Sequence, residues 1–144
     1  MPTSPYLAHI SALGQVQTVL EHLTGTAKLC AHFASAFDAE EQGLLAGMAH
    51  DIGKYSDAFQ RRLRGGPLVD HATAGAVECQ KLRQPYAAFA VAGHHGGLPD
   101  GGSRTDTPDQ ATFLARMNRA VAGKIEPYDA WQRGGTLDQS GVVY

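Results

Sequence analysis

The chain of 144 residues is poor in cysteine, and it has neither a long apolar run nor an excess of positive charge. Its two cysteines, Cys30 and Cys79, are too few for a disulfide framework, so we expect both to be small core residues in a reducing compartment. No apolar run approaches the roughly 20 residues that cross a bilayer. A basic-then-apolar secretory leader is also lacking. We therefore predict a cytoplasmic protein that makes no contact with a membrane.

The charge balance excludes a protein that holds nucleic acid by charge alone. Lys and Arg number 12 against 14 Asp and Glu, which gives a net charge of -2 and a pI near 6.4. A nucleic-acid substrate would have to be met by metal ions and a few local basic residues. No phosphate-binding loop of the Gly-x-x-x-x-Gly-Lys-Ser/Thr type is present, so the chain is not expected to be an ATPase by itself.

Apolar residues recur at steps of three and four, which predicts helices over most of the chain. The expected helices cover residues 15–37, 40–51, 55–64, 70–83, 86–95, 110–122 and 127–133. Residues 96–108 are rich in Gly, Asp, Ser and Pro, which predicts an exposed loop. Because no segment shows strand alternation, we predict an all-α helical bundle in one domain, residues 1–133, followed by an irregular tail, residues 134–144.

The helix expected over residues 40–51 contains two glycines, Gly43 and Gly47. Glycine inside a helix costs about 1 kcal/mol, and it is usually retained where two helices approach closely. We therefore expect this helix to be central.

Two adjacent pairs of metal-ligand residues each end an apolar run. His50-Asp51 is followed by Ile52-Gly53-Lys54, and His94-His95 is followed by two glycines. Neighbouring residues in mid-helix point about 100° apart and rarely serve one metal. At a helix end that glycine unwinds, both side chains can turn toward the same point.

Other histidines extend this pattern. His22 lies at the edge of a buried helical stripe, and His71 precedes small residues that leave room for a metal cluster. His9 and His32 lack such a setting, and His32 is about 80° around the helix from His22. We expect those two histidines to lie at the surface, or to contact the ligands without binding the metal. The sequence thus predicts a metal site between central helices, formed by His22, His50, Asp51, His71, His94 and His95. Imidazole-rich sites favour Mn, Fe, Co, Ni or Zn, with Mg as an alternative.

These residues resemble the HD phosphohydrolase superfamily. The longer string is similar to the HD nuclease domain of type I CRISPR-associated nuclease-helicases over about residues 6 to 133. The matching motifs are His22-Leu23, Met48-Ala49-His50-Asp51-Ile52-Gly53-Lys54, Phe59-Gln60, His71 with Gly75-Ala76, and Gly93-His94-His95-Gly96-Gly97-Leu98-Pro99-Asp100.

The resemblance implies a nuclease that cleaves single-stranded DNA with one or two divalent metal ions and a metal-activated water. His22, His50 and Asp51 would serve one metal, and Asp51 would bridge to a second metal held by the remaining three histidines. Lys54 would lie near the scissile phosphate as a second catalytic residue beside Asp51, although it could equally be a solvated lysine. The implied partners are a superfamily-2 helicase module, in cis or in trans, and an RNA-guided CRISPR surveillance complex.

The chain departs from that family in two places. Ala72 stands where the family commonly has serine, and no late aspartate in an Ala-Asp context is found. Asp129 does not fit that motif, and Asp106, Asp109 and Asp138 lie in an expected loop or tail. The domain is therefore expected to lack its last helices and to have one metal site that is incomplete.

Three functions remain open on the sequence. The first is the nuclease. The second is a phosphohydrolase acting on a nucleotide or cyclic dinucleotide. The third is a degenerate HD scaffold that only binds partners.

Overall fold

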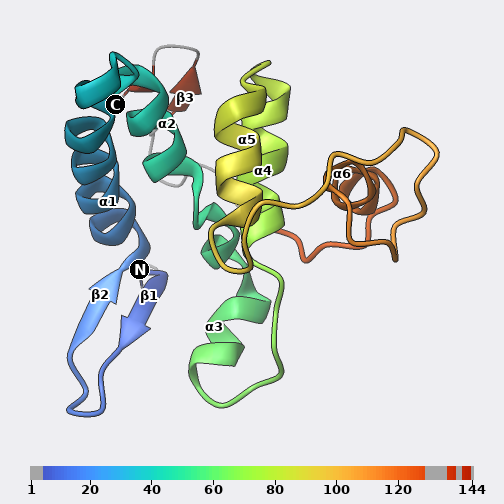
Figure 1. Ribbon diagram of the computed structural model, residues 1–144. Coiled ribbons are helices and arrows are strands. Elements are labelled where there is room, and N and C mark those ends of the chain that lie inside the picture. Colours follow the sequence, from blue (N-terminus) through green and yellow to red (C-terminus); the bar gives the residue numbers. More distant parts are fainter. Residues whose placement is uncertain (1–4, 129–135, 139–140, 144) are drawn as a thin grey trace.

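A computed structural model describes residues 5–128, 136–138 and 141–143. Its main elements are helices, which confirms the all-α class. The helices are α1 (Val19–Ala34), α2 (Glu40–Ala49), α3 (Asp57–Leu63), α4 (Ala72–Lys81), α5 (Pro85–Gly93) and α6 (Phe113–Val121), with 3-10 turns η1 (Ser35–Phe37) and η2 (Ile52–Tyr55). In Figure 1, α1 and α2 lie side by side, α4 and α5 form a second pair, and α3 lies below them.

Helix α2 is central, as its glycines predicted. It packs against α1 on one side and against α4 and α5 on the other. A Cβ atom on Gly43 would lie 2.5 Å from the carbonyl oxygen of Cys30, and one on Gly47 would lie 2.6 Å from the Cα atom of Ala27. Neither position in α2 can therefore carry a side chain without moving α1.

Two groups of buried side chains form the core on either side of α2. One lies between α2, α4, α5 and α6 and includes Leu45, Val91 and Phe113. The other joins α1, α2 and η2 to the N-terminal segment and includes Leu23 and Ile52. Burial on both faces of α2 fixes the position of its C-terminal end, where the metal-ligand pair begins.

The N-terminal segment is a β-hairpin, which corrects the expectation that no strand is present. Strands β1 (Leu7–Ile10) and β2 (Val16–Thr18) pair antiparallel, so the expected helix over residues 15–37 begins only at Val19. Thr18 and Glu21 form a capping box at the start of α1. This cap starts the helix four residues later than the apolar stripe suggested, and the strands are too short for alternation to be visible.

The C-terminal tail is not irregular where the structure describes it, so that prediction was wrong. Strands β3 (Thr136–Asp138) and β4 (Gly141–Val143) pair antiparallel. Three-residue strands show no recognisable period in a sequence. Residues 127 and 128 are not helical, and the rest of the helix expected over 127–133 lies outside the described residues.

The segment after the His50-Asp51 pair is a 3-10 turn followed by a short helix, rather than one helix from residue 55. Ser56 is the N-cap of α3 and accepts a hydrogen bond from the backbone N–H of Phe59. The Gln60 side chain joins this segment to the hairpin, because it accepts from the backbone N–H of Leu7 and donates to the carbonyl oxygens of Leu7 and Lys54. The hairpin is thereby held against η2.

Within the parts of the chain that the structure describes, no helix combines the length and apolar character needed to cross a bilayer.

The contact between α4 and the end of α2 can be tested with a glycine pair. A Cβ atom on Gly75 would overlap the carbonyl oxygen of Ala49, whereas Gly25 on the exposed side of α1 has open space. We predict that Gly75→Ala lowers the free energy of unfolding by about 1–3 kcal/mol, because backbone must move. Gly25→Ala should instead raise it by about 0.5–1 kcal/mol. Urea unfolding measures both, and equal effects would contradict the packing described.

Candidate metal centre

The two ligand pairs lie at helix ends, as their glycines predicted. His50 is the C-cap of α2, and Asp51 follows it in a non-helical conformation at the start of η2. His94 is the C-cap of α5, and the chain turns at Gly97, whose φ is +89°. At each pair the chain leaves the helix, so both members can face the centre of the molecule.

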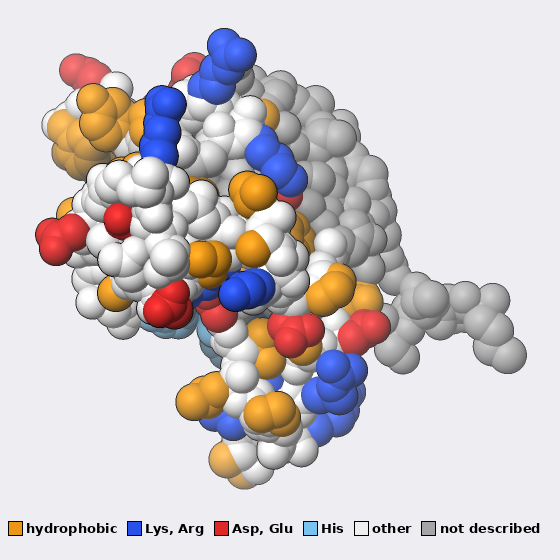
Figure 2. Space-filling model, turned by 90° about the vertical axis from the view of Figure 1, so that its right-hand side faces the viewer, with side chains coloured by type: hydrophobic (Ala, Val, Ile, Leu, Met, Phe, Trp, Pro, Cys, Tyr) orange, Lys and Arg blue, Asp and Glu red, His pale blue; other side chains and the backbone are white. Residues whose placement is uncertain are grey.

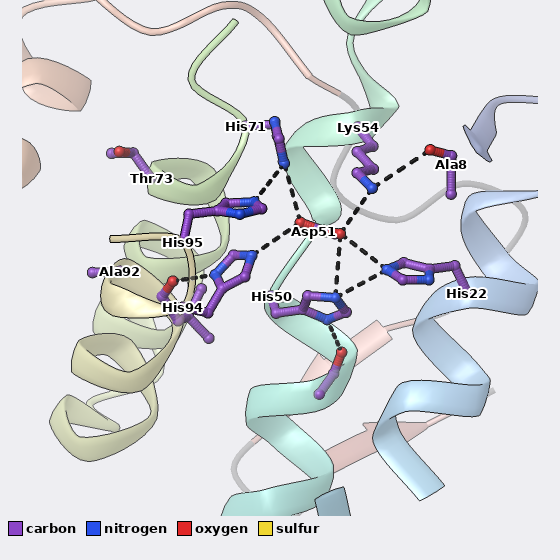
Figure 3. A network of polar contacts seen from close by, with 12 residues as sticks. Ala8, His22, His50, Asp51, Lys54, His71, Thr73, Ala92, His94 and His95 are labelled. Carbon is purple, nitrogen blue, oxygen red and sulfur yellow. Dashed lines mark hydrogen bonds and ion pairs between the residues drawn. The ribbon is translucent and has the colours of Figure 1, made fainter. Parts of the chain in front are cut away.

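The Asp51 carboxylate is the centre of the cluster, with each oxygen facing a different group of histidines (Figure 3). Its Oδ2 lies 3.0 Å from Nε2 of His22 and 3.2 Å from Nε2 of His50. Its Oδ1 lies 3.4 Å from Nε2 of His71 and 3.3 Å from Nε2 of His94. His95 joins the second group, because its Nε2 is 2.9 Å from Nε2 of His71. The structure therefore brings together all six residues that the sequence singled out as ligands.

Backbone carbonyls orient three of the imidazoles. Nδ1 of His50 donates to the carbonyl oxygen of Gly47 at 2.6 Å, and Nδ1 of His94 donates to that of Val91 at 2.6 Å. Nδ1 of His71 donates to Val69 at 3.3 Å. A carbonyl oxygen only accepts, so Nδ1 carries a proton in each case. While such a ring keeps a second proton, its Nε2 can donate to Asp51, and once that proton is lost Nε2 presents its lone pair to the centre of the cluster.

The donor atoms fit divalent metal binding in both chemistry and spacing. His22 Nε2 and His50 Nε2 are 3.0 Å apart, and with Asp51 Oδ2 they form a triangle with edges of 3.0 to 3.2 Å. Ligands at right angles with bonds of about 2.1 Å would be separated by about 3.0 Å. A second set with suitable spacing contains Asp51, His94 and His95. Each set has room for one cation, and Asp51 is common to both.

Burial and hydrogen bonding act in opposite directions on the charge of Asp51. Burial alone would raise its pKa, but hydrogen bonds from His22, His50 and His94 outweigh burial and hold the pKa well below its usual range. Burial lowers the pKa of His71, with a contribution from the nearby Lys54 ammonium. Burial likewise lowers the pKa of His95, assisted by the charge of His94. The carboxylate is therefore ionised, and protons compete little for His71 and His95 at neutral pH.

The pKa of His94 shifts in the other direction. Burial would lower it, but the hydrogen bonds to Asp51 and to the Val91 carbonyl raise it above its ordinary value. Of His71, His94 and His95, His94 is thus the one whose lone pair is most readily taken by a proton as the pH falls.

Lys54 is buried beside the cluster, which rules out the alternative of a solvated lysine. Only 4% of the residue is exposed, and its Nζ atom lies 3.0 Å from Asp51 Oδ2. Nζ also donates to the carbonyl oxygen of Ala8 in β1 at 3.5 Å and lies 5.2 Å from the centre of the Phe59 ring. Phe59 is itself buried, and its ring contacts that of His71. The hairpin and α3 therefore hold a positive charge at the oxygen that faces His22 and His50.

His9 is closer to the cluster than its sequence context indicated. Its ring packs edge-on against that of His22, with centroids 4.9 Å apart. The expectation of a residue at the surface or behind the ligands is consistent with this position, but nothing in the sequence located it because strand β1 was not predicted. His32 lies beside Phe33 in the last turn of α1 and is exposed.

The aspartates that were considered as a late metal ligand are not found at the cluster in the described residues. Asp106 accepts hydrogen bonds from Thr112 and from the backbone of Ser103 within the loop before α6, so it stabilises that loop rather than the cluster. Asp129 lies outside the described residues. In the described ranges, Asp51 is the single carboxylate in the sets of suitably spaced ligand atoms.

The cluster generates a prediction for metal binding. His50→Ala removes one donor from the triangle and should weaken Mn²⁺ or Zn²⁺ binding by more than about 100-fold, since even residues that only orient a ligand contribute about 10- to 100-fold. The matched control is His32→Ala, at an exposed histidine outside the cluster. Competition with a fluorescent chelator measures both affinities. Equal affinities in the two variants would contradict the ligand assignment.

A family comparison agrees with this geometry. The sequence model of the HD domain matches residues 19–123, which include α1 to α6 and all six clustered ligand candidates. His22 lies within α1, and the other five residues of the cluster lie at or just beyond the ends of α2, α4 and α5. The chain therefore belongs to the HD domain family, and its fold and its cluster indicate a metal-dependent phosphohydrolase.

Proposed function

We propose that this HD domain is a metal-dependent nuclease that hydrolyses phosphodiester bonds in single-stranded DNA during CRISPR interference. The observation that carries the proposal is the position of Asp51, whose two oxygens face two separate groups of imidazoles. Two cations sharing one carboxylate would activate a water molecule and neutralise the phosphoryl oxygens of a diester.

The charge of the cluster favours an anionic substrate. Imidazoles bind metals in their neutral form, so in a metal-loaded cluster the one carboxylate and the one ammonium would give these residues a net charge near zero. Divalent cations bound there would leave the site strongly positive. A phosphodiester provides the compensating negative charge, which supports a nucleic-acid substrate despite the overall net charge of -2.

The ligand side chains can be reached from solvent. The side chains of His22, His71 and His94 are 18%, 18% and 23% exposed, respectively. Figure 2 shows histidine side chains at the surface where the upper part of the molecule meets the lower lobe. A cluster that is partly open to solvent suits a polymer that lies across it better than a site that must enclose a small nucleotide.

Lys54 is assigned a catalytic role beside Asp51. Its ammonium is fixed by three neighbours and lies at the edge of the ligand triangle, so it would face a phosphoryl oxygen without having to reorganise. Arg61, Arg62 and Arg64 on and after α3 are exposed and could contact the backbone of the same strand. The strand would be supplied by a superfamily-2 helicase module, in cis or in trans, recruited by an RNA-guided surveillance complex.

The nuclease proposal is tested with circular single-stranded DNA in the presence of Mn²⁺ or Ni²⁺. The wild-type protein should linearise and degrade the circle, and Asp51→Ala should abolish cutting because it removes the group shared by both ligand sets. Folding of the variant is checked by circular dichroism. An intact circle, together with hydrolysis of a mononucleotide or cyclic dinucleotide, would contradict the proposal and favour a nucleotide phosphohydrolase.

The role of Lys54 is tested by Lys54→Gln. We expect kcat for DNA cleavage to fall by about 10²- to 10³-fold, as for removal of one fixed electrostatic donor. Metal affinity should not fall, because the variant removes a cation from beside the site. Lys28→Gln, at an exposed lysine of α1, is the control. Parallel loss of metal and activity in Lys54→Gln would mean that Lys54 has a structural role only.

A further inference from the structure

A cavity of about 720 Å³ adjoins the second ligand group and has no role in the mechanism described above. His71 and His95 line one side of it, and the chain that follows α5 lines the other. Its volume lies in the range of about 300 to 1000 Å³ that is typical of small-molecule sites. A group attached to a phosphate held at the cluster could therefore extend directly into this cavity.

The back of the cavity is a fixed wall. Arg116 of α6 donates to the hydroxyl of Thr73 in α4 through Nε and Nη2, at 3.1 and 2.9 Å, and to the carbonyl oxygen of Ala92 in α5 through Nη1. Thr73 in turn donates to the Asp70 carboxylate at 2.6 Å. These bonds join three helices and leave none of the guanidinium nitrogens of Arg116 without a protein acceptor.

The loop side of the cavity is also held in place. Asn118 of α6 donates to the carbonyl oxygen of Asp106 at 2.8 Å, and Arg119 donates to those of Pro108 and Gln110. The backbone N–H of Phe113 donates to the carbonyl oxygen of Asp100 at 2.8 Å. Helix α6 thus positions both walls, and the cavity exists before any ligand arrives.

The two carboxylates of the lining favour a neutral group over a phosphate. Asp70 and Asp100 both line the cavity, and three of the five N–H groups of the one guanidinium there, that of Arg116, already donate to protein acceptors. Apolar contact is available from Val69, Leu98 and Pro99.

Asp100 is a charged side chain of the lining that remains available to a ligand. The Asp70 carboxylate accepts from the backbone N–H and hydroxyl of Thr73 and lies near Arg116 and Arg119. For the Asp100 carboxylate, no hydrogen bond or ion pair is found among the described residues. A carboxylate only accepts hydrogen bonds, so it pairs with a ligand that donates, and it repels a carbonyl oxygen at the same place.

We propose that this cavity binds one nucleoside of the DNA strand, next to the phosphodiester at the cluster, and that Asp100 selects bases that carry an amino group. The inference rests on the proposed nuclease function for its substrate. Asp100 is a specificity-determining residue in this account, and it takes no part in the hydrolysis.

The closest pair of test ligands is deoxycytidine and deoxyuridine hexanucleotides. Cytosine has an amino group where uracil has a carbonyl, and at the adjacent ring nitrogen cytosine has a lone pair where uracil has an N–H. Neither base carries a methyl group. Binding of labelled hexanucleotides is measured by fluorescence anisotropy in EDTA, where no cleavage occurs. Cleavage is measured separately as kcat/KM with Mn²⁺.

We expect wild-type protein to prefer the deoxycytidine hexanucleotide by about tenfold in both measurements, the discrimination typical of a hydrogen bond to a charged group. Asp100→Asn should remove this preference, because an amide serves either base. Ala111→Trp, at an exposed position lining the cavity, should weaken binding of both hexanucleotides by filling the space. Ala122→Trp, at an exposed alanine that does not line this cavity, is the matched control and should change neither measurement.

The outcomes separate this inference from the nuclease proposal. Cleavage of both hexanucleotides with equal kcat/KM, unaffected by Asp100→Asn and Ala111→Trp, would overturn the cavity assignment and leave the nuclease standing. Selective binding in EDTA that is lost in both variants, without cleavage of any strand, would support the nucleoside site and contradict the nuclease. Equal binding of both hexanucleotides by wild-type and variant proteins in EDTA would also overturn the assignment.

Discussion

The fold positions one ionised carboxylate between two groups of imidazoles, and the rest of the site depends on that contact. Asp51 is buried, and hydrogen bonds from histidines on α1, α2 and α5 hold its pKa well below the usual range. A buried carboxylate without such partners would take up a proton. Without Asp51, the two groups of histidines would have no common metal ligand between them. Each half of the cluster therefore requires Asp51, and Asp51 requires both halves.

The packing around α2 explains how the cluster forms from distant parts of the sequence. Gly43 and Gly47 let α1 approach closely, which brings His22 to the end of α2. Gly75 lets α4 approach the last carbonyl of α2 from the other side, which brings His71. The hairpin adds the carbonyl oxygen of Ala8, which helps hold Lys54 against Asp51. Small residues therefore determine the distances between ligands that are far apart in the chain.

Much of this arrangement could be predicted from the sequence, and the exceptions have physical causes. Helix ends and close helix contacts can be recognised in a sequence by their glycines and other small residues. These residues indicated the two ligand pairs, the central position of α2 and the space beside His71. The hairpin β1–β2 was missed because its strands are three and four residues long. The burial of Lys54 and the position of His9 follow from that hairpin, so they could not be inferred. The cavity beside His95 could not be predicted from the sequence either, because it depends on how Arg116 joins α6 to α4 and α5.

The measurement that tests the central claim most directly is anomalous diffraction from crystals soaked with Mn²⁺. The account predicts two anomalous peaks, one bound by Asp51 Oδ2 with His22 and His50, and the other bound by Asp51 Oδ1 with histidines of the second group. A single peak that leaves the second group without a metal would contradict the shared carboxylate. Peaks that make no contact with Asp51 would contradict the whole assignment of the site.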